Sequence, residues 1–224
     1  MKKSTIIAGF IFLALALADV LSIAIGGNNL HFFIKPFLMP SLALTALLQL
    51  LPENNGKLTW LMLIGLCFHT LGDILLMFDS KGFVYFAAGL GAFLVGHFFY
   101  LAVLLSGMGG LKGWKEALCL VVPLVLAPVL VGLFGVEWPF SAVVTIYAFT
   151  LMCVAASGAL WGLRKKAFAA RIFWGGLIFI ISDSLIAINA FAGLDFYGRG
   201  AMVMITYLLA EWLLVSGMVR GKLS

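Results

Sequence analysis

Two aspartates lie inside apolar segments that are otherwise suited to a lipid bilayer. Asp73 follows a glycine and precedes Ile-Leu-Leu, and Asp183 follows a serine and precedes Ser-Leu-Ile, so the two surroundings are related. A charge at the bilayer centre costs roughly 2.5–3.5 kcal/mol on the insertion scale, which makes function the default explanation for such a residue. We therefore take Asp73 and Asp183 as the candidate catalytic residues, held face to face inside a membrane.

Two carboxyl groups in a dry pocket suit acid–base chemistry. Burial and a neighbouring negative charge favour the protonated form of one carboxyl group while the other stays ionised. Such a pair serves hydrolysis through an oxocarbenium ion, as in glycosidases, and a vinyl ether reacts in the same way. The sequence does not assign the two roles; our working choice for the acid is Asp183, which is expected to lie deeper than Asp73.

Further polar residues are spaced so that they share helix faces with each other or with an aspartate. His69 precedes Asp73 by four residues, His97 precedes Tyr100 by three, and Tyr207 precedes Glu211 by four. Residues three or four apart are neighbours on a helix surface. The candidate substrate-binding residues are Lys35, His97, Tyr100, Tyr147, Tyr207 and Glu211.

Each of these residues also has a purely structural interpretation. Asp19 and Lys35 fit a simple ion pair near the membrane interface. His69 fits a packed core histidine as well as it fits a functional residue. Glu211 fits a hydrogen-bonding residue between helices, and buried tyrosines are common in any core. Asp73 itself fits a structural partner of Lys35.

The composition predicts an integral membrane protein. Of 224 residues, 64% are hydrophobic and only 10% are charged, and the mean hydropathy is +1.17. A soluble chain of this size exposes too much surface to hide that much apolar area. One spanning helix needs about 20 residues, so we expect an all-α bundle of eight transmembrane helices in a single domain, residues 1–224. The three cysteines lack paired spacing, and nothing indicates a nucleic-acid partner.

The apolar segments give approximate helix positions. We expect helices at about 5–25, 33–51, 58–77, 83–105, 117–133, 139–163, 172–191 and 200–219. Turns are expected at 26–29, 52–57 and 79–82, with His31 in a loop. Pro36 is expected in the first turn of the second helix, where its missing N–H is tolerated, and Pro40 is expected to loosen that helix.

Charge distribution predicts the orientation. Eight spans place both termini on one side, which then holds 11 of the 14 Lys and Arg residues, against Lys35, Lys81 and Arg199 on the other. The positive-inside rule makes the N- and C-termini cytoplasmic. Asp183 lies 110 residues after Asp73, and Tyr207 lies 110 residues after His97. This equal offset is consistent with a parallel repeat of four plus four helices.

The chain resembles the YhhN family of eight-helix membrane proteins, which includes the lysoplasmalogenases. The segments that carry this resemblance extend over the expected second to eighth helices: Lys35-Pro36 with Pro40, Gly72-Asp73-Ile74-Leu75-Leu76, Gly89 through Gly96-His97 and Tyr100, Ser182-Asp183-Ser184-Leu185, and Tyr207 with Glu211. Glu211 stands where the family often has glutamine.

The resemblance implies a function. It implies hydrolysis of the vinyl-ether bond of lysoplasmalogens to a fatty aldehyde and glycerophospho-ethanolamine or -choline. It also implies that Asp73 and Asp183 are the catalytic pair, that no metal or organic cofactor takes part, and that the partners are a lysophospholipid and membrane lipids. The expected location is the cell membrane, which in a Gram-negative bacterium is the inner membrane.

Three other functions remain open from the sequence. A metal-dependent membrane hydrolase would bind zinc through His69, Asp73, His97 and Asp183. A small transporter would use Asp73, Asp183 and Glu211 as a proton or cation relay. A non-catalytic lipid-binding protein would bind a lysolipid without turning it over. The oligomeric state is not predicted.

Overall fold

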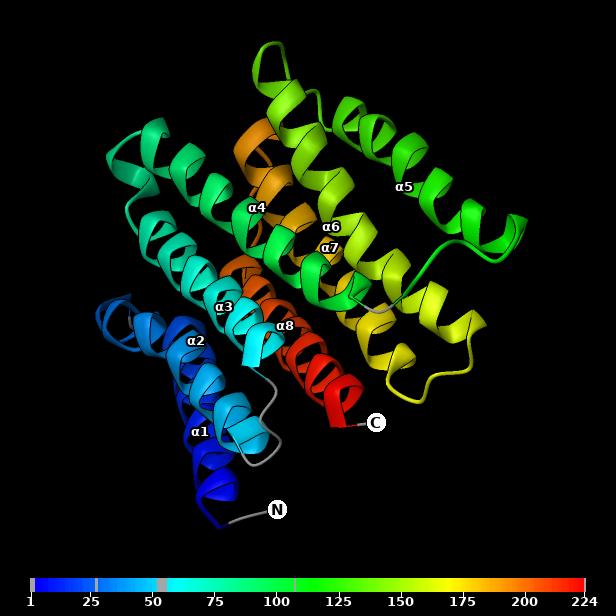
Figure 1. The fold of residues 1–224 in the computed structure, drawn as a ribbon. Coiled ribbons are helices and arrows are strands. Elements are labelled where there is room, and N and C mark those ends of the chain that lie inside the picture. Colours follow the sequence, from blue (N-terminus) through cyan, green and yellow to red (C-terminus); the bar gives the residue numbers. More distant parts are fainter. Residues whose placement is uncertain (1–2, 27, 52–55, 107, 224) are drawn as a thin grey trace. The chain divides into compact units, whose positions relative to one another are not determined.

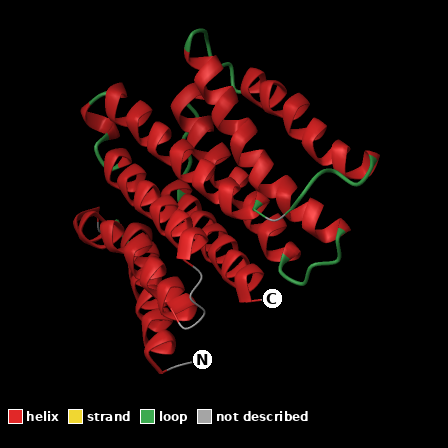
Figure 2. Cartoon of the chain, viewed as in Figure 1, coloured by secondary structure: helices red, strands yellow, loops and turns green. Residues whose placement is uncertain are grey.

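The computed structural model describes residues 3–26, 28–51, 56–106 and 108–223. Within these ranges the chain is built from α-helices joined by short loops, and no strand is present (Figures 1 and 2). The α-helices are α1 Lys3–Ala24, α2 Asn28–Leu50, α3 Gly56–Leu76, α4 Phe83–Leu105, α5 Trp114–Leu133, α6 Phe140–Leu163, α7 Ala169–Ala192 and α8 Arg199–Leu223. All eight are long and apolar enough to cross a membrane, which confirms the expected all-α, eight-helix class.

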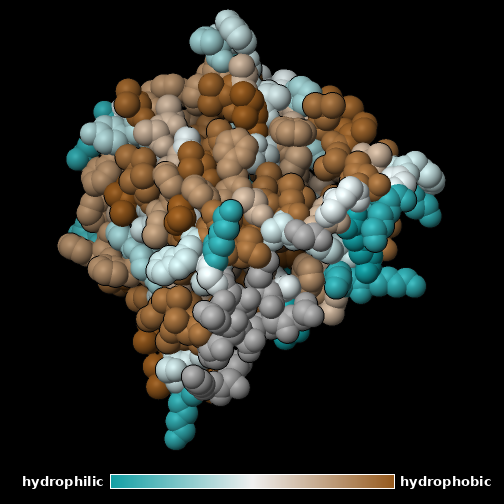
Figure 3. Space-filling model, in the orientation of Figure 1, coloured by the Kyte–Doolittle hydropathy of each residue, from teal (hydrophilic) through white to brown (hydrophobic). Residues whose placement is uncertain are grey.

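The exposed side chains are those of a membrane protein. Hydrophobic atoms, drawn in brown, cover most of the face shown in Figure 3. On α5, large apolar residues such as Leu124, Val125 and Val129 are each more than half exposed. Lipid tails rather than water are the natural surroundings of such a surface.

The start of the second helix differs from the sequence expectation. It begins at Asn28 rather than near residue 33, so His31 lies in α2 and not in a loop. Pro36 and Pro40 consequently lie inside the helix instead of near its entrance. The expectation was wrong because it began the helix at the first apolar residues, whereas polar residues such as asparagine are themselves favoured at helix starts.

Smaller differences occur at other boundaries. Helix α5 begins at Trp114, so it includes Glu116, and α7 begins at Ala169, so it includes Arg171. Of the turn expected at 52–57, residues 52–55 lie outside the described residues, and Gly56 already begins α3. The turn expected at 79–82 contains a short 3-10 helix, Asp79–Lys81.

The chain forms two compact units. The first unit contains Met1–Val103 with Val219–Ser224, and the second contains Leu104–Met218. In the first unit α1 packs on α2 and α2 packs on α3, and in the second α6 packs on both α5 and α7 (Figure 1). A single transmembrane domain, cytoplasmic termini and a four-plus-four repeat stay predictions.

Glycines allow two pairs of helices to approach closely, one pair in each unit. A Cβ atom added to Gly96 on α4 would lie 2.1 Å from Cδ2 of His69 on α3. A Cβ atom added to Gly176 on α7 would lie 2.6 Å from Cα of Ala155 on α6. Both distances are far below van der Waals contact, so only glycine permits this packing, as at many helix interfaces in membranes.

Candidate functional site

Asp73 is buried in the first unit and has a cation as its neighbour. The Nζ atom of Lys35, on α2, lies 3.7 Å from Oδ1 of Asp73, on α3, and both side chains are largely shielded from solvent. Because α2 begins at Asn28, Lys35 is two turns inside the helix and can reach across to α3. A cation at this distance balances a negative charge on Asp73.

The ion pair between Asp19 and Lys35, which was one interpretation of the sequence, does not form, because each residue has another partner. Asp19 on α1 is fully buried, and its Oδ1 lies 2.8 Å from Nδ1 of His31 on α2. His31 and Lys35 are four residues apart, so they share one face of α2, and each contacts an aspartate of a different neighbouring helix. This spacing was visible in the sequence, but it was missed because His31 was assigned to a loop.

An aromatic cluster lies one helical turn from Asp73. The ring of His69 lies 4.8 Å from that of His97 and 4.7 Å from that of Tyr100, measured between centroids. Its ring also lies 5.2 Å from that of Phe93, which the sequence analysis did not single out. The first unit thus brings together Lys35, Asp73, His97 and Tyr100 on three consecutive helices, all of them except Lys35 buried.

Asp183 lies in the second unit and accepts a hydrogen bond from a tyrosine. The hydroxyl group of Tyr147, on α6, donates to Oδ2 of Asp183, on α7. The close backbone approach at Gly176 brings these two helices together. The two residues are 36 positions apart in the chain, so spacing gave no signal of this contact, and the sequence predicted Tyr147 only as a substrate-binding residue.

Helix α8 adds two of the predicted residues to the same unit. Glu211 is fully buried and interacts electrostatically with Tyr147. The ring of Tyr207 packs edge-on against Phe179 of α7, with 5.5 Å between centroids. Ser182, the residue before Asp183, donates from Oγ to the carbonyl oxygen of Val203 over 3.1 Å, which ties α7 to α8 beside the aspartate.

The predicted site residues therefore form one group in each unit. The first group contains Lys35, Asp73, His97 and Tyr100, and the second contains Tyr147, Asp183, Tyr207 and Glu211. That Asp73 and Asp183 act together stays a prediction. Among the described residues, no three His, Cys, Asp or Glu side chains are grouped as a metal site requires.

The fold and the buried polar groups define a class. Eight apolar helices of spanning length, with Asp73, Asp183 and Glu211 among them, make this chain a multi-pass membrane protein. The family model described as the YhhN family matches residues 30–218. The chain belongs to the YhhN family, as the sequence resemblance implied.

Curated relatives of the chain carry two kinds of name. Over 128 residues it is 32% identical to "Uncharacterized membrane protein YhhN" of Escherichia coli O6:H1, covering 56% of this chain and 59% of that protein. Over 166 residues it is 31% identical to "Lysoplasmalogenase TMEM86A" of Homo sapiens, covering 71% of this chain and 65% of that protein. Over 176 residues it is 31% identical to "Lysoplasmalogenase TMEM86B" of Sus scrofa, covering 79% and 70%.

The matched region spans less than two thirds of the length of the E. coli and human relatives. No solved structure matches the chain.

Proposed function

We propose that this protein is a lysoplasmalogenase. It would hydrolyse the vinyl-ether bond of a 1-alkenyl-glycerophospho-ethanolamine or -choline to a fatty aldehyde and the glycerophospho compound. The observation that carries the proposal is the match of 71% of the chain to a relative named lysoplasmalogenase. The two polar groups around Asp73, which is buried, and Asp183, which is half-buried, support it, because the reaction needs a general acid and a general base shielded from bulk water.

The proposed reaction uses the aspartates in turn. The protonated aspartate transfers its proton to the alkenyl carbon that is not bonded to oxygen, which leaves an oxocarbenium ion at the neighbouring carbon. The ionised aspartate takes a proton from water as the water oxygen bonds to that carbon. As the hemiacetal breaks its bond to the glycerol oxygen, that oxygen takes the proton from the aspartate that acted as base, and the hemiacetal hydroxyl group gives its proton to the aspartate that acted as acid. The aldehyde is released and both aspartates regain their starting states.

The cation beside Asp73 supports one assignment of roles. Lys35 beside Asp73 balances a negative charge, so we assign the base to Asp73. Tyr147 donates to Oδ2 of Asp183, so the proton that an acidic Asp183 delivers would be carried by Oδ1. This agrees with the working choice made from the sequence.

The other predicted residues keep a substrate-lining role in the proposal. His97, Tyr100, Tyr207 and Glu211 are buried and would contact the lysolipid, and Lys35 would also bind its phosphate. The proposed location is the cell membrane, which is the inner membrane in a Gram-negative bacterium. The substrate would enter from the bilayer.

The test is aldehyde release from lysoplasmalogen by the purified full chain in detergent. Asp73→Asn and Asp183→Asn should abolish release while the proteins stay folded. Asp79→Asn, which changes an exposed carboxylate outside the spanning helices, should retain it. A chelator arm tests the metal-dependent alternative.

Isotopes test the chemical route. In ¹⁸O-labelled water the aldehyde should carry the label, because the hemiacetal keeps the water oxygen. In D₂O it should carry one deuterium on the carbon next to the carbonyl. A well-folded wild-type protein that releases no aldehyde from either head group would refute the proposal.

A further inference from the structure

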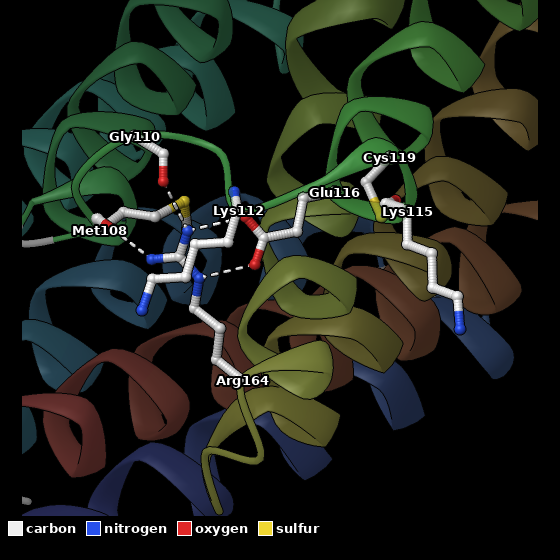
Figure 4. Close-up of polar contacts among 7 residues, drawn as sticks. All are labelled: Met108, Gly110, Lys112, Lys115, Glu116, Cys119 and Arg164. Carbon is white, nitrogen blue, oxygen red and sulfur yellow. Dashed lines mark hydrogen bonds and ion pairs between the residues drawn. The ribbon is translucent and has the colours of Figure 1, made fainter.

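A polar cluster around Arg164 joins the α4–α5 loop to the end of α6 in the second unit (Figure 4). Nε and Nη2 of Arg164 donate to the two carboxylate oxygens of Glu116 over 2.9 and 2.8 Å. Arg164 also donates to the carbonyl oxygens of Met108 and Gly110, the latter over 3.0 Å. The backbone N–H of Lys112 donates to Glu116 over 2.8 Å. We call these five residues the Arg164 clamp.

The clamp is a rigid connection and not a pair of mobile surface charges. A two-point contact between a guanidinium group and a carboxylate fixes both distance and orientation. The hydrogen bond to Glu116 raises the pKa of the Arg164 guanidinium, so the arginine stays charged. The clamp therefore holds the loop before α5 and the loop after α6 in a fixed relation.

Four exposed lysines adjoin the clamp. Lys112 belongs to it, Lys115 precedes Glu116, and Lys165 and Lys166 follow Arg164 directly. Between residues 104 and 171 the only acidic residues are Glu116, which Arg164 neutralises, and Glu137, which lies near the other end of the α5–α6 hairpin. The four lysines thus give this end of the second unit a concentrated positive charge without a carboxylate to balance it.

The position of these lysines relative to the spanning helices indicates their partner. Helix α5 begins at Trp114 and α6 ends at Leu163, so the clamp lies where both spans leave the hydrocarbon. The Trp114 side chain is 73% exposed, and Nζ of Lys115 lies 5.7 Å from its ring centre. Tryptophan in this setting is typical of the head-group level of a membrane, where lysines attract anionic lipids.

We propose that the Arg164 clamp and its four lysines form a binding site for the phosphate groups of anionic phospholipids in the surrounding membrane. Each ammonium group supplies a positive charge and three hydrogen-bond donors to phosphate oxygens. The clamp's role is to hold the lysines of two separate loops at the same membrane surface. This site is independent of the proposed hydrolysis.

The experiment uses spin-labelled phosphatidylglycerol and phosphatidylcholine added to the full chain in detergent. The immobilised fraction of each label gives the relative affinity, and wild type should prefer phosphatidylglycerol. A lysine near an anionic membrane contributes about a fivefold change in affinity at low salt. Lys165→Gln with Lys166→Gln should therefore weaken phosphatidylglycerol binding about 25-fold, whereas Lys81→Gln, an exposed lysine of the first unit, should not.

A second variant separates an organised site from diffuse charge. Glu116→Gln with Arg164→Gln removes the ion pair but leaves the net charge of the cluster unchanged. Its free-energy preference for phosphatidylglycerol over phosphatidylcholine should fall to half of the wild-type value or less. Thermal unfolding checks that the variant is folded. If that double variant does not fold, the exposed lysine variants still decide the question.

Three results would overturn the proposal. The first is equal binding of the two lipids by wild type, or an unchanged affinity for phosphatidylglycerol when Lys165 and Lys166 are both replaced by glutamine. The second is an unchanged lipid preference in the folded clamp variant, which would leave only diffuse attraction. The third is displacement of the lipid by an equal concentration of inorganic phosphate, which would make free phosphate the ligand.

Discussion

Tyr147→Phe would remove one oxygen atom from the second unit and leave the buried aromatic ring in place. The lost hydroxyl group is the donor to Oδ2 of Asp183. As the proposed acid, Asp183 becomes a carboxylate when it gives up its proton, and a hydrogen bond to a charged group contributes about 1.5–3 kcal/mol. At about 1.4 kcal/mol for each factor of ten in rate, kcat should fall roughly 10- to 150-fold if this bond orients the catalytic carboxyl group.

The assay is steady-state aldehyde release, with kcat and KM determined separately over a range of pH. KM should change less than twofold, because the aromatic ring of Tyr147 remains in place. The pH profile of kcat should differ from that of wild type, because the Asp183 carboxyl group has lost the donor to its Oδ2. Glu211 of α8, which also interacts electrostatically with Tyr147, is unchanged in the Tyr147→Phe variant.

A matched control lies one turn further along the same helix. The hydroxyl group of Thr150 donates to the carbonyl oxygen of Ile146 over 2.7 Å and not to Asp183. Thr150→Val therefore removes a buried hydroxyl group from α6 without touching the carboxylate, and kcat should stay within about twofold of wild type.

Two outcomes would refute the reasoning about Tyr147. If Tyr147→Phe keeps the wild-type kcat and pH profile, the hydrogen bond does not position Asp183. If only KM rises, Tyr147 contacts the substrate, as the sequence analysis predicted. Infrared difference spectra of the carboxyl band, assigned with Asp183→Asn, test the contact even in a protein without turnover.

Three further perturbations follow from the packing. Lys35→Met leaves buried Asp73 without its cation and should lower the free energy of unfolding by about 3 kcal/mol in chemical denaturation, with Lys35→Arg restoring most of it; equal stability of all three proteins would contradict this. Gly176→Leu forces side-chain atoms against Ala155 and should cost about 3 kcal/mol or more, and a wild-type melting temperature would argue against the close contact. The hydrogen bond from Arg199 lowers the pKa of the Asp195 carboxyl group, so the stabilisation from this contact is present at neutral pH and lost as the pH falls below about 4. Asp195→Asn should reduce the fall in melting temperature over this pH range. The same fall in variant and wild type would exclude the contact as its source.

Sequence reasoning was strongest where hydropathy and charge decide the structure. A span needs a long apolar segment whatever its neighbours are, so each of the eight helices was expected within a few residues, and Asp73 and Asp183 stood out as costly exceptions. The start of α2 was missed because Asn28 and Asn29 look like part of a turn. In the structure these two residues begin α2, and the same first turns of the helix carry His31, which contacts the buried Asp19.

The contacts of the site residues were harder to predict, for a physical reason. In a soluble helix, alternation of polar and apolar residues shows which face is buried. In these helices the lipid-facing side is apolar too, so the pattern does not reveal which faces meet. Lys35 with Asp73 and Tyr147 with Asp183 are separated by 38 and 36 positions, and only the packing of their helices brings them together.

The ion pair between Glu116 and Arg164 also has a consequence for biogenesis. Glu116 lies in the first turn of α5 and Arg164 follows α6, so the two groups meet on one face of the bilayer when both helices have crossed the membrane. Had one crossing failed, the carboxylate and the guanidinium group would sit on opposite faces of the bilayer, each without its partner. The salt bridge thus distinguishes a correctly inserted α5–α6 hairpin from one in which a single helix has been inserted, because the second cannot form this contact.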